Sequence, residues 1–264
     1  MTATISSQRP LRIVAVSGSR ADWGFLVKPL EALKGDAAFD VRLAVTGQHL
    51  DARSGNTIEA IRAGGFTVDD IIDPQLSGDS AQETTDALAR IASGMADVIA
   101  RRSPDLVLIL GDRYEILACA SAAMMAQVPM VHLCGGDVSE GAVDDVIRHA
   151  VSKLAHVHFP TNAEAAERLV QMGENPARVH MVGSTGLDLL QSVPILPRAE
   201  FFSRLKLVPR RQMVLVTVHP VTLAEDPSAD ARALVAALRG LPDDVGLIMC
   251  GTNADTGRHG ITAL

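Results

Sequence analysis

The sequence predicts an α/β protein with doubly wound, mostly parallel sheets. Short apolar runs alternate along the chain with stretches of helical periodicity, and this alternation is typical of strand–helix–strand units. The runs are continuously apolar, which indicates strands that are covered on both faces, as in a parallel sheet. Hydrophobic residues make up 47% of the 264 residues and charged residues 21%, a composition that excludes a mainly disordered chain.

Each expected element follows from its own stretch of sequence. Runs rich in branched apolar residues predict strands at 11–16, 40–45, 105–110, 129–133, 156–159, 179–182, 213–218 and 245–249. The stretches between them predict helices at 24–33, 57–63, 80–101, 114–126, 143–155, 162–172 and 229–238. Ser80 and Asn162 are expected to be N-caps, because their side chains can accept a hydrogen bond from the first helical turn.

The organisation predicts two Rossmann-like domains. Residues 1–190 form the first, residues 191–211 form a linker with three prolines and five lysines or arginines, and residues 212–264 form the second. Only two clear strands fall in the second domain, which is little for an independent core. We therefore expect the chain to be C-terminally incomplete, with a divergent small domain as the alternative.

The net charge and the composition limit the classes of molecule that the protein could bind. Lys and Arg number 24 against 31 Asp and Glu, for a net charge of −7, and aromatic residues make up 3%. The negative net charge and the few aromatic residues argue against binding to nucleic acid or to an anionic membrane surface. The three cysteines lack paired spacing and the N-terminus is polar, so we expect no disulfide framework, no metal site and a cytoplasmic location.

Polar residues follow most of the expected strands. Ligands bind beyond the carboxyl ends of the strands of an open α/β sheet, so these segments share one candidate edge. They are 17–24, 111–115, 134–145, 183–188, 219–222 and 250–255.

The first of these segments, GSRADWG, is a small-residue turn that leads into a helix. Its backbone N–H groups and Arg20 could hold a phosphate, although it matches neither common dinucleotide nor P-loop spacing. The alternative is that Ser19 or Asp22 only caps the helix. For GDRYE the alternatives are a catalytic Asp112 or an Asp112 that caps the next helix, with Arg113 and Glu115 as solvated surface.

The segment HLCGGDVSEGAVDDVIRHA is the richest. His132 and Cys134 end a strand, and a group of acidic residues follows within a few positions, namely Asp137, Glu140, Asp144 and Asp145. Crowded carboxylates raise the pKa of at least one member, as a general acid or base near neutral pH requires. The alternative is a capped helix with an ordinary ion pair between these acids and Arg148 or His149. We expect His149, His156 and His158 to be structural, and His219 is either a site residue or a loop histidine.

At this point the sequence resembles a known family. SGSRADWG, ILGDRYE, HLCGGDVSEGAVDDVIRHAVSKLAHVHF, ERLVQMGENPARVHMVGSTGLD, VTVHPVT and TNADTGR occur in this order between Arg12 and Arg258. Together they are similar to the hydrolysing UDP-N-acetylglucosamine 2-epimerases of the sialic acid pathway. The resemblance implies a GT-B-like fold of two Rossmann-type domains, and members continue past this segment with further nucleotide-holding strands.

The resemblance also implies a reaction and its residues. UDP leaves C1 as H-2 is removed, and water adds to the glycal, so that UDP-N-acetylglucosamine gives N-acetylmannosamine and UDP. No metal or other cofactor is required. The implied catalytic residues are Asp112, Asp137, Asp145 and His219, and the implied substrate-binding residues are Arg20, Arg113, His132, Ser184 and Asn253. The expected partners are a UDP-sugar and further copies of the chain in a dimer or tetramer.

Two positions depart from the family pattern. Cys134 stands where relatives often have Glu or His, and Asp137 stands where many have Glu, so the accepted sugar can differ. The alternatives are the same reaction on UDP-2,4-diacetamido-2,4,6-trideoxyglucose for legionaminic acid-type synthesis, a GT-B glycosyltransferase, and a non-catalytic nucleotide-sugar-binding relic.

Overall fold

A computed structural model describes residues 9–78, 80–251, 260, 261 and 263. The chain divides into two compact units. The first comprises Met1–Glu140 and Asp144–Gln191, and the second comprises Gly141–Val143 and Ser192–Leu264.

The first unit contains a six-stranded sheet in which all neighbouring strands are parallel. The strand order is β3-β2-β1-β4-β5-β6. The strands are β1 (Leu11–Ser17), β2 (Phe39–Val45), β3 (Asp70–Ile71), β4 (Leu106–Leu110), β5 (Met130–Leu133) and β6 (Val157–Phe159). The order reverses between β1 and β4, and the crevice at such a switch point is where doubly wound sheets bind ligands.

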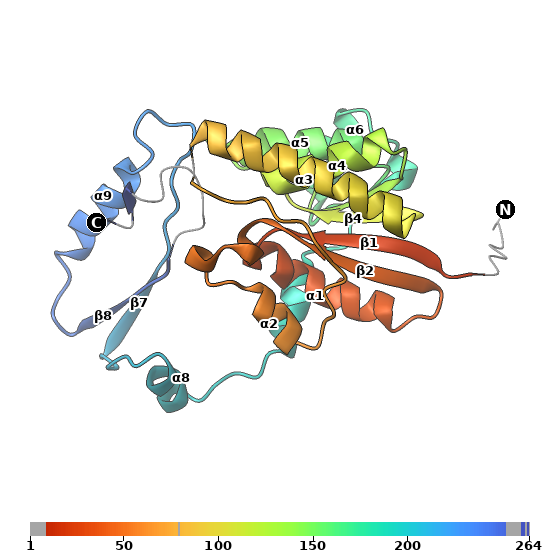
Figure 1. The fold of residues 1–264 in the computed structure, drawn as a ribbon. Coiled ribbons are helices and arrows are strands. Elements are labelled where there is room, and N and C mark those ends of the chain that lie inside the picture. The colour runs from red at the N-terminus through yellow and green to blue at the C-terminus, as the bar shows by residue number, and fades with distance from the viewer. Residues whose placement is uncertain (1–8, 79, 252–259, 262, 264) are drawn as a thin grey trace. The chain divides into compact units, whose positions relative to one another are not determined.

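Helices cover both faces of this sheet (Figure 1). On one face lie α1 (Arg20–Lys34) and α2 (Ile58–Ala63). On the other face lie α3 (Ala81–Arg102), α4 (Tyr114–Met125) and α5 (Val143–Leu154). Each face has its own apolar core, which explains why the strands read as continuous apolar runs.

Side chains of both helix layers are fully buried against the strands. Leu26 and Leu30 of α1 pack in the first core, and Ile91 and Met95 of α3 pack in the second. Burial of one such side chain stabilises the fold by about 1.5–3 kcal/mol.

The two expected N-caps are confirmed. Ser80 and Glu83 form a reciprocal capping box at the start of α3. The Asn162 side chain accepts a hydrogen bond from the N–H of Ala165, at 2.8 Å, at the start of α6 (Ala163–Gln171). These caps set where the two helices begin.

The elements of three regions differ from the sequence prediction. The strand expected at 179–182 is wrong: Val179 makes only an isolated bridge to His158, and Met181 and Val182 are exposed. The short β3 was not predicted, because its two residues join the sheet by pairing with β2 rather than by an apolar pattern. Residues 185–204, read as the end of one domain and part of a linker, contain α7 (Thr185–Ser192) and α8 (Arg198–Arg204).

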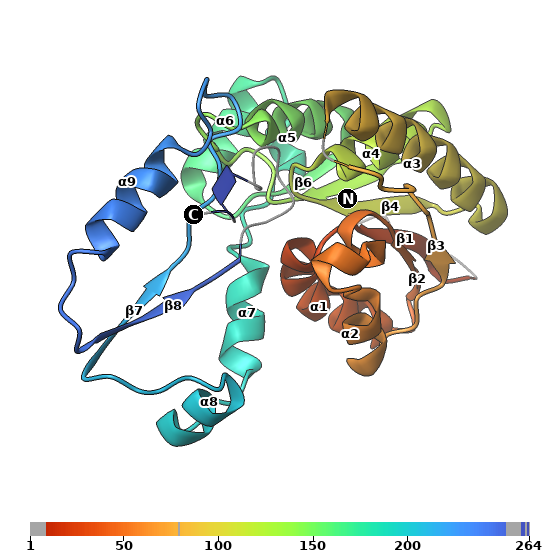
Figure 2. The same ribbon diagram turned by 60° about the vertical axis from the view of Figure 1, so that its left-hand side comes forward.

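The second unit is built on a parallel pair of strands, β7 (Gln212–Val216) and β8 (Val245–Met249), shown in Figure 2. Helix α9 (Ala229–Leu238) lies between them in the sequence, as expected for a strand–helix–strand unit. Within the described ranges of both units, no helix has the length and apolar character needed to cross a membrane.

Candidate functional site

The turn after β1 shows how the first predicted segment folds. The Ser19 hydroxyl accepts a hydrogen bond from the N–H of Asp22 at 3.3 Å, and Asp22 Oδ2 accepts one from the N–H of Gly18 at 3.0 Å. The helix-capping interpretation of Ser19 is therefore confirmed. Arg20 is the first residue of α1 and is exposed, so its guanidinium is accessible to a ligand at this helix N-terminus.

Two buried carboxyl groups flank an arginine at the switch point. Glu115 is 0% exposed and Asp22 is 5% exposed, and Arg113 Nε lies 3.4 Å from Glu115 Oε2. Burial raises the pKa of both carboxyl groups, while the positive charge of Arg113 opposes this rise. The interpretation of Glu115 as solvated surface is therefore wrong, and Arg113 has acidic side chains beside it.

Gly47 makes room for this cluster. Its φ is +60°, and a Cβ there would lie 2.6 Å from the carbonyl oxygen of Gly18 and 2.8 Å from Glu115 Oε1. Any larger residue would push on both the β1 turn and the buried carboxyl group. The backbone of Gly18 and Gly47 therefore packs closely against the Glu115 side chain at the start of α4.

We expect Glu115→Gln to stabilise the fold at neutral pH. An acid whose pKa is raised on folding contributes most stability below its unfolded pKa of about 4.3, and this contribution is lost as the pH rises through the folded pKa. Each unit of pKa rise is worth about 1.4 kcal/mol. Urea unfolding of both proteins from pH 4 to pH 8 measures the difference. An advantage of the variant that shrinks as the pH rises would contradict the prediction.

Asp112 lies two residues after the end of β4 and is half-buried. Its carboxylate pairs with the Arg148 guanidinium of α5. The N-cap position of α4 belongs to Arg113, which makes no side-chain capping bond. The capping interpretation of Asp112 is therefore wrong, and its carboxylate is held at the sheet edge by a residue 36 positions away in the sequence.

His132 lies beneath the Asp112 turn. It is 0% exposed, its Nε2 lies 2.8 Å from the carbonyl oxygen of Gly111, and its Nδ1 lies 3.1 Å from the Ser152 hydroxyl. Burial lowers the pKa of His132 to about 4. Both ring nitrogens are engaged inside the protein, so the histidine supports the turn, and its expected contact with a substrate stays a prediction.

Asp137 ends a tight turn after β5. Its carboxylate accepts hydrogen bonds from the Thr161 hydroxyl at 3.0 and 3.1 Å and from the Asn162 side-chain amide at 3.0 Å. Cys134 precedes it with a positive φ of 60°. Burial and then the charges of Asp137 and Asp22 raise the pKa of the Cys134 thiol to about 12, so this sulfur stays protonated at neutral pH.

Asp145 lies in the first turn of α5. Its Oδ1 accepts a hydrogen bond from the N–H of Ser139 at 2.7 Å, and His149 Nε2 lies 3.8 Å from its Oδ2. Helix α5 therefore contacts two of the candidate segments: Arg148 pairs with Asp112, and Asp145 binds the backbone of Ser139. The Asp137 carboxylate is held separately, by Thr161 and Asn162.

Three further residues were predicted to bind substrate or to take part in catalysis, namely Ser184, His219 and Asn253. Ser184 is half-buried just before α7, and its carbonyl oxygen accepts a hydrogen bond from the N–H of Leu187 at 3.0 Å. His219 is exposed after β7 in the second unit, with Nε2 3.5 Å from the Thr217 hydroxyl. Asn253 lies outside the described residues.

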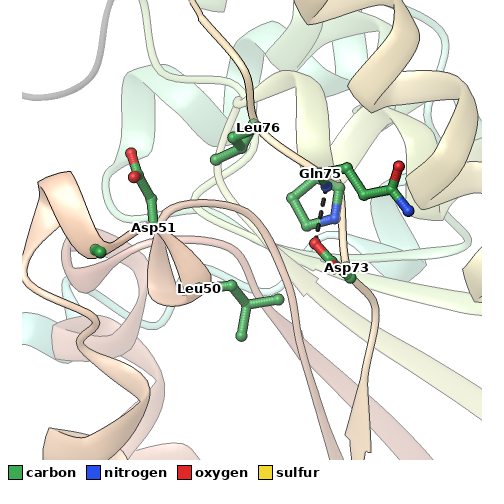
Figure 3. Close-up of a pocket in the computed structure, with 7 residues that line it drawn as sticks. Leu50, Asp51, Asp73, Gln75 and Leu76 are labelled. Carbon is green, nitrogen blue, oxygen red and sulfur yellow. Dashed lines mark hydrogen bonds between the residues drawn. The ribbon is translucent and has the colours of Figure 1, made fainter.

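A pocket of about 420 Å³ lies beyond the carboxyl ends of β2 and β3 (Figure 3). In it the Asp73 carboxylate accepts a hydrogen bond from the N–H of Gln75 at 2.8 Å. None of the predicted site residues that the structure describes lines it; its residues are Leu50, Asp51, Ala52, Asp73, Pro74, Gln75 and Leu76. In the part of the chain that the structure describes, no group of three or more His, Cys, Asp or Glu side chains could hold a metal ion.

Comparison with known proteins gives the family. The family profile described as UDP-N-acetylglucosamine 2-epimerase matches residues 31–264. The chain is 36% identical over 249 residues to a UDP-N,N'-diacetylbacillosamine 2-epimerase (hydrolyzing) of Legionella pneumophila, covering 94% of this chain and 65% of that protein. It is 32% identical over 245 residues to a GDP/UDP-N,N'-diacetylbacillosamine 2-epimerase (hydrolyzing) of Campylobacter jejuni, covering 92% of this chain and 63% of the relative. The chain thus spans slightly less than two thirds of these relatives.

Solved structures show the fold. A UDP-GlcNAc 2-epimerase from Neisseria meningitidis, solved bound to UDP-GlcNAc, aligns with a TM-score of 0.79 at 15% identity, over 96% of this chain and 69% of that one. The predicted α/β, GT-B-like class with mostly parallel sheets is confirmed. The matched profile and the relatives above 30% identity show that this chain belongs to the UDP-N-acetylglucosamine 2-epimerase family.

Proposed function

We propose that the protein is a hydrolysing 2-epimerase of a UDP-linked 2-acetamido sugar. It converts the UDP-sugar and water to UDP and the free sugar with inverted C2. The observation that carries the proposal is that Asp112 follows β4, Asp137 follows β5 and Asp145 lies in the first turn of α5, with Asp112 paired to Arg148 of the same helix. Membership of the epimerase family supports the same reaction.

The chemistry explains why several carboxylates are needed. H-2 has no neighbouring carbonyl, so it becomes acidic only as the C1–O bond to UDP lengthens and C1 gains positive charge. One carboxylate takes H-2 as UDP leaves, which forms a C1=C2 double bond. Water then adds its oxygen to C1 and a proton returns to C2 from the opposite face. Carboxylates near C1 stabilise its positive charge as well as moving protons.

We assign the leaving diphosphate to Arg20 and Arg113. Arg20 begins α1 and Arg113 is the N-cap residue of α4, so both cations lie where free N–H groups and the helix dipole favour an anion. The acidic pair of Asp22 and Glu115 holds Arg113 beside the switch point.

Other parts of the proposal rest on the sequence. Ser184, His219 and Asn253 are proposed to bind substrate or, for His219, to assist the leaving diphosphate. We also propose a cytoplasmic homo-oligomer, a dimer or tetramer, that needs no cofactor.

Two sugars fit the reaction. UDP-N-acetylglucosamine would give N-acetylmannosamine for sialic acid-type synthesis. UDP-2,4-diacetamido-2,4,6-trideoxyglucose is favoured by a specific observation, because the Legionella and Campylobacter relatives at 36% and 32% identity are named for N,N'-diacetylbacillosamine. Both substrates undergo the same chemistry at C1 and C2, so the reaction does not depend on the choice.

We expect the product formed in D₂O to carry deuterium at C2. The protein is incubated with each UDP-sugar, and mass spectrometry and NMR identify the free sugar and UDP. A carboxylate removes H-2, and a deuteron derived from solvent is then added to the opposite face of C2. The product must therefore carry one deuterium at an inverted C2. A free sugar with its original C2 configuration and no deuterium would contradict the epimerase proposal and favour simple hydrolysis. The larger kcat/KM of the two sugars identifies the substrate.

A further inference from the structure

Helix α5 carries two polar residues one turn apart that both act on the Asp112 turn. The Arg148 guanidinium pairs with Asp112 Oδ2 through Nη2. The Ser152 hydroxyl lies 3.1 Å from His132 Nδ1, and His132 Nε2 lies 2.8 Å from the carbonyl oxygen of Gly111. Since a carbonyl oxygen only accepts, Nε2 carries the proton and Nδ1 accepts from Ser152. The backbone and the side chain of this turn are thus both fixed from α5.

Burial of the Arg148 guanidinium costs desolvation free energy. Arg148 is 8% exposed, and its Nε and Nη1 atoms are buried without a hydrogen-bond partner among the residues that the structure describes. A buried charge with unused donors contributes little to stability, and apolar residues of similar size often serve the fold as well or better. Among the described residues, its charge partner is Asp112.

We infer that Arg148 is a positioning residue for Asp112, which holds the carboxylate at Oδ2 and leaves Oδ1 to face the substrate proton. This inference rests on the proposed role of Asp112 in the epimerase reaction. A guanidinium is planar and directs its N–H groups along fixed lines, so it restricts the carboxylate more than a lysine ammonium does. A misplacement of about 1 Å in an acid–base group can lower the rate by about 10²-fold.

Three variants test the inference: Arg148→Met keeps the volume, Arg148→Lys keeps the charge, and Arg148→Ala leaves a space. We expect Arg148→Met and Arg148→Ala to lower kcat by about 10²-fold with a much smaller change in KM, and Arg148→Lys to recover only part of the loss. Added guanidinium should restore part of the activity of Arg148→Ala, whereas urea, which has a similar shape and no charge, should not. Arg62→Ala, an exposed arginine paired with Glu59 on α2, is the matched control and should keep wild-type turnover.

The outcomes separate this inference from the proposed function. Absence of turnover in the unaltered protein would count against the proposed function. Wild-type kcat in a folded Arg148→Met, or a loss in Arg148→Ala that guanidinium does not restore, would overturn the role of Arg148. A double-mutant cycle of Arg148→Met and Asp112→Ala, read by urea unfolding, tests the pairing without activity. Additive changes in unfolding free energy would overturn the pairing, and a clear departure from additivity supports it.

Discussion

Replacement of Asp112 by asparagine is expected to lower turnover by about 10²–10⁴-fold in a protein that keeps its fold. Asp112 follows β4 at the ligand-binding edge of the sheet, and Arg148 holds its carboxylate. Asparagine keeps the shape and an oxygen that can accept from Arg148, but it cannot take up or release a proton. The loss should therefore appear in kcat, with little change in KM. Steady-state kinetics with the UDP-sugar and circular dichroism on the same sample measure activity and fold.

The matched control is an aspartate with no role at the sheet edge. Asp97 is exposed on α3, so Asp97→Asn makes the same chemical change far from the Asp112 turn and should keep wild-type turnover. Wild-type-like turnover in a folded Asp112→Asn would remove Asp112 from the catalytic residues. Equal losses of turnover in the two variants would show that the loss comes from the change in net charge or from impaired folding, and not from the position of Asp112.

Local chemistry explains why much of the fold could be predicted. The runs that became β1 and β4 are continuously apolar because each lies in a parallel sheet that is covered on both faces, and buried strands need no alternation. The caps Ser80 and Asn162 depend on bonds within one helical turn, so they too are visible in the sequence. Residues at the ends of these strands were expected to lie at one edge, which follows from parallel topology.

The parts of the site that were missed depend on contacts between distant segments. Glu115 is buried because α4 begins against the β1 turn and Gly47 leaves space for its carboxyl group, and nothing within GDRYE shows this. The alternative interpretation paired Arg148 or His149 with the acids of the same segment, but the structure pairs Arg148 with Asp112. A signal was available for Arg148: Val151 at i+3 and Ala155 at i+7 are apolar, so the arginine shares a helix face with core residues.

The turn after β5 requires glycine at position 136, because an alanine there would be both strained and overpacked. Gly136 has a φ of +83°, and a Cβ there would overlap the carbonyl oxygen of Ala165 and lie 3.0 Å from Leu169 Cγ. We expect Gly136→Ala to lower the free energy of unfolding by about 2–5 kcal/mol, because a left-handed alanine costs about 1–2 kcal/mol and overpacking costs about 1–3 kcal/mol. Urea unfolding of the variant and the wild type measures this loss.

Gly65 separates the two causes. It has a φ of +84° after α2, and nothing lies within 4 Å of a Cβ built there. Gly65→Ala should therefore show only the backbone cost, and the difference between the two variants measures the collision with α6. Because Asp137 follows Gly136 and is held by Thr161 and Asn162 at the start of α6, a turn pushed off α6 would also move this carboxylate. Folded Gly136→Ala should lose turnover while Gly65→Ala keeps it. Equal destabilisation of the two variants would show that the turn tolerates the added methyl group and that Asp137 does not depend on this close packing.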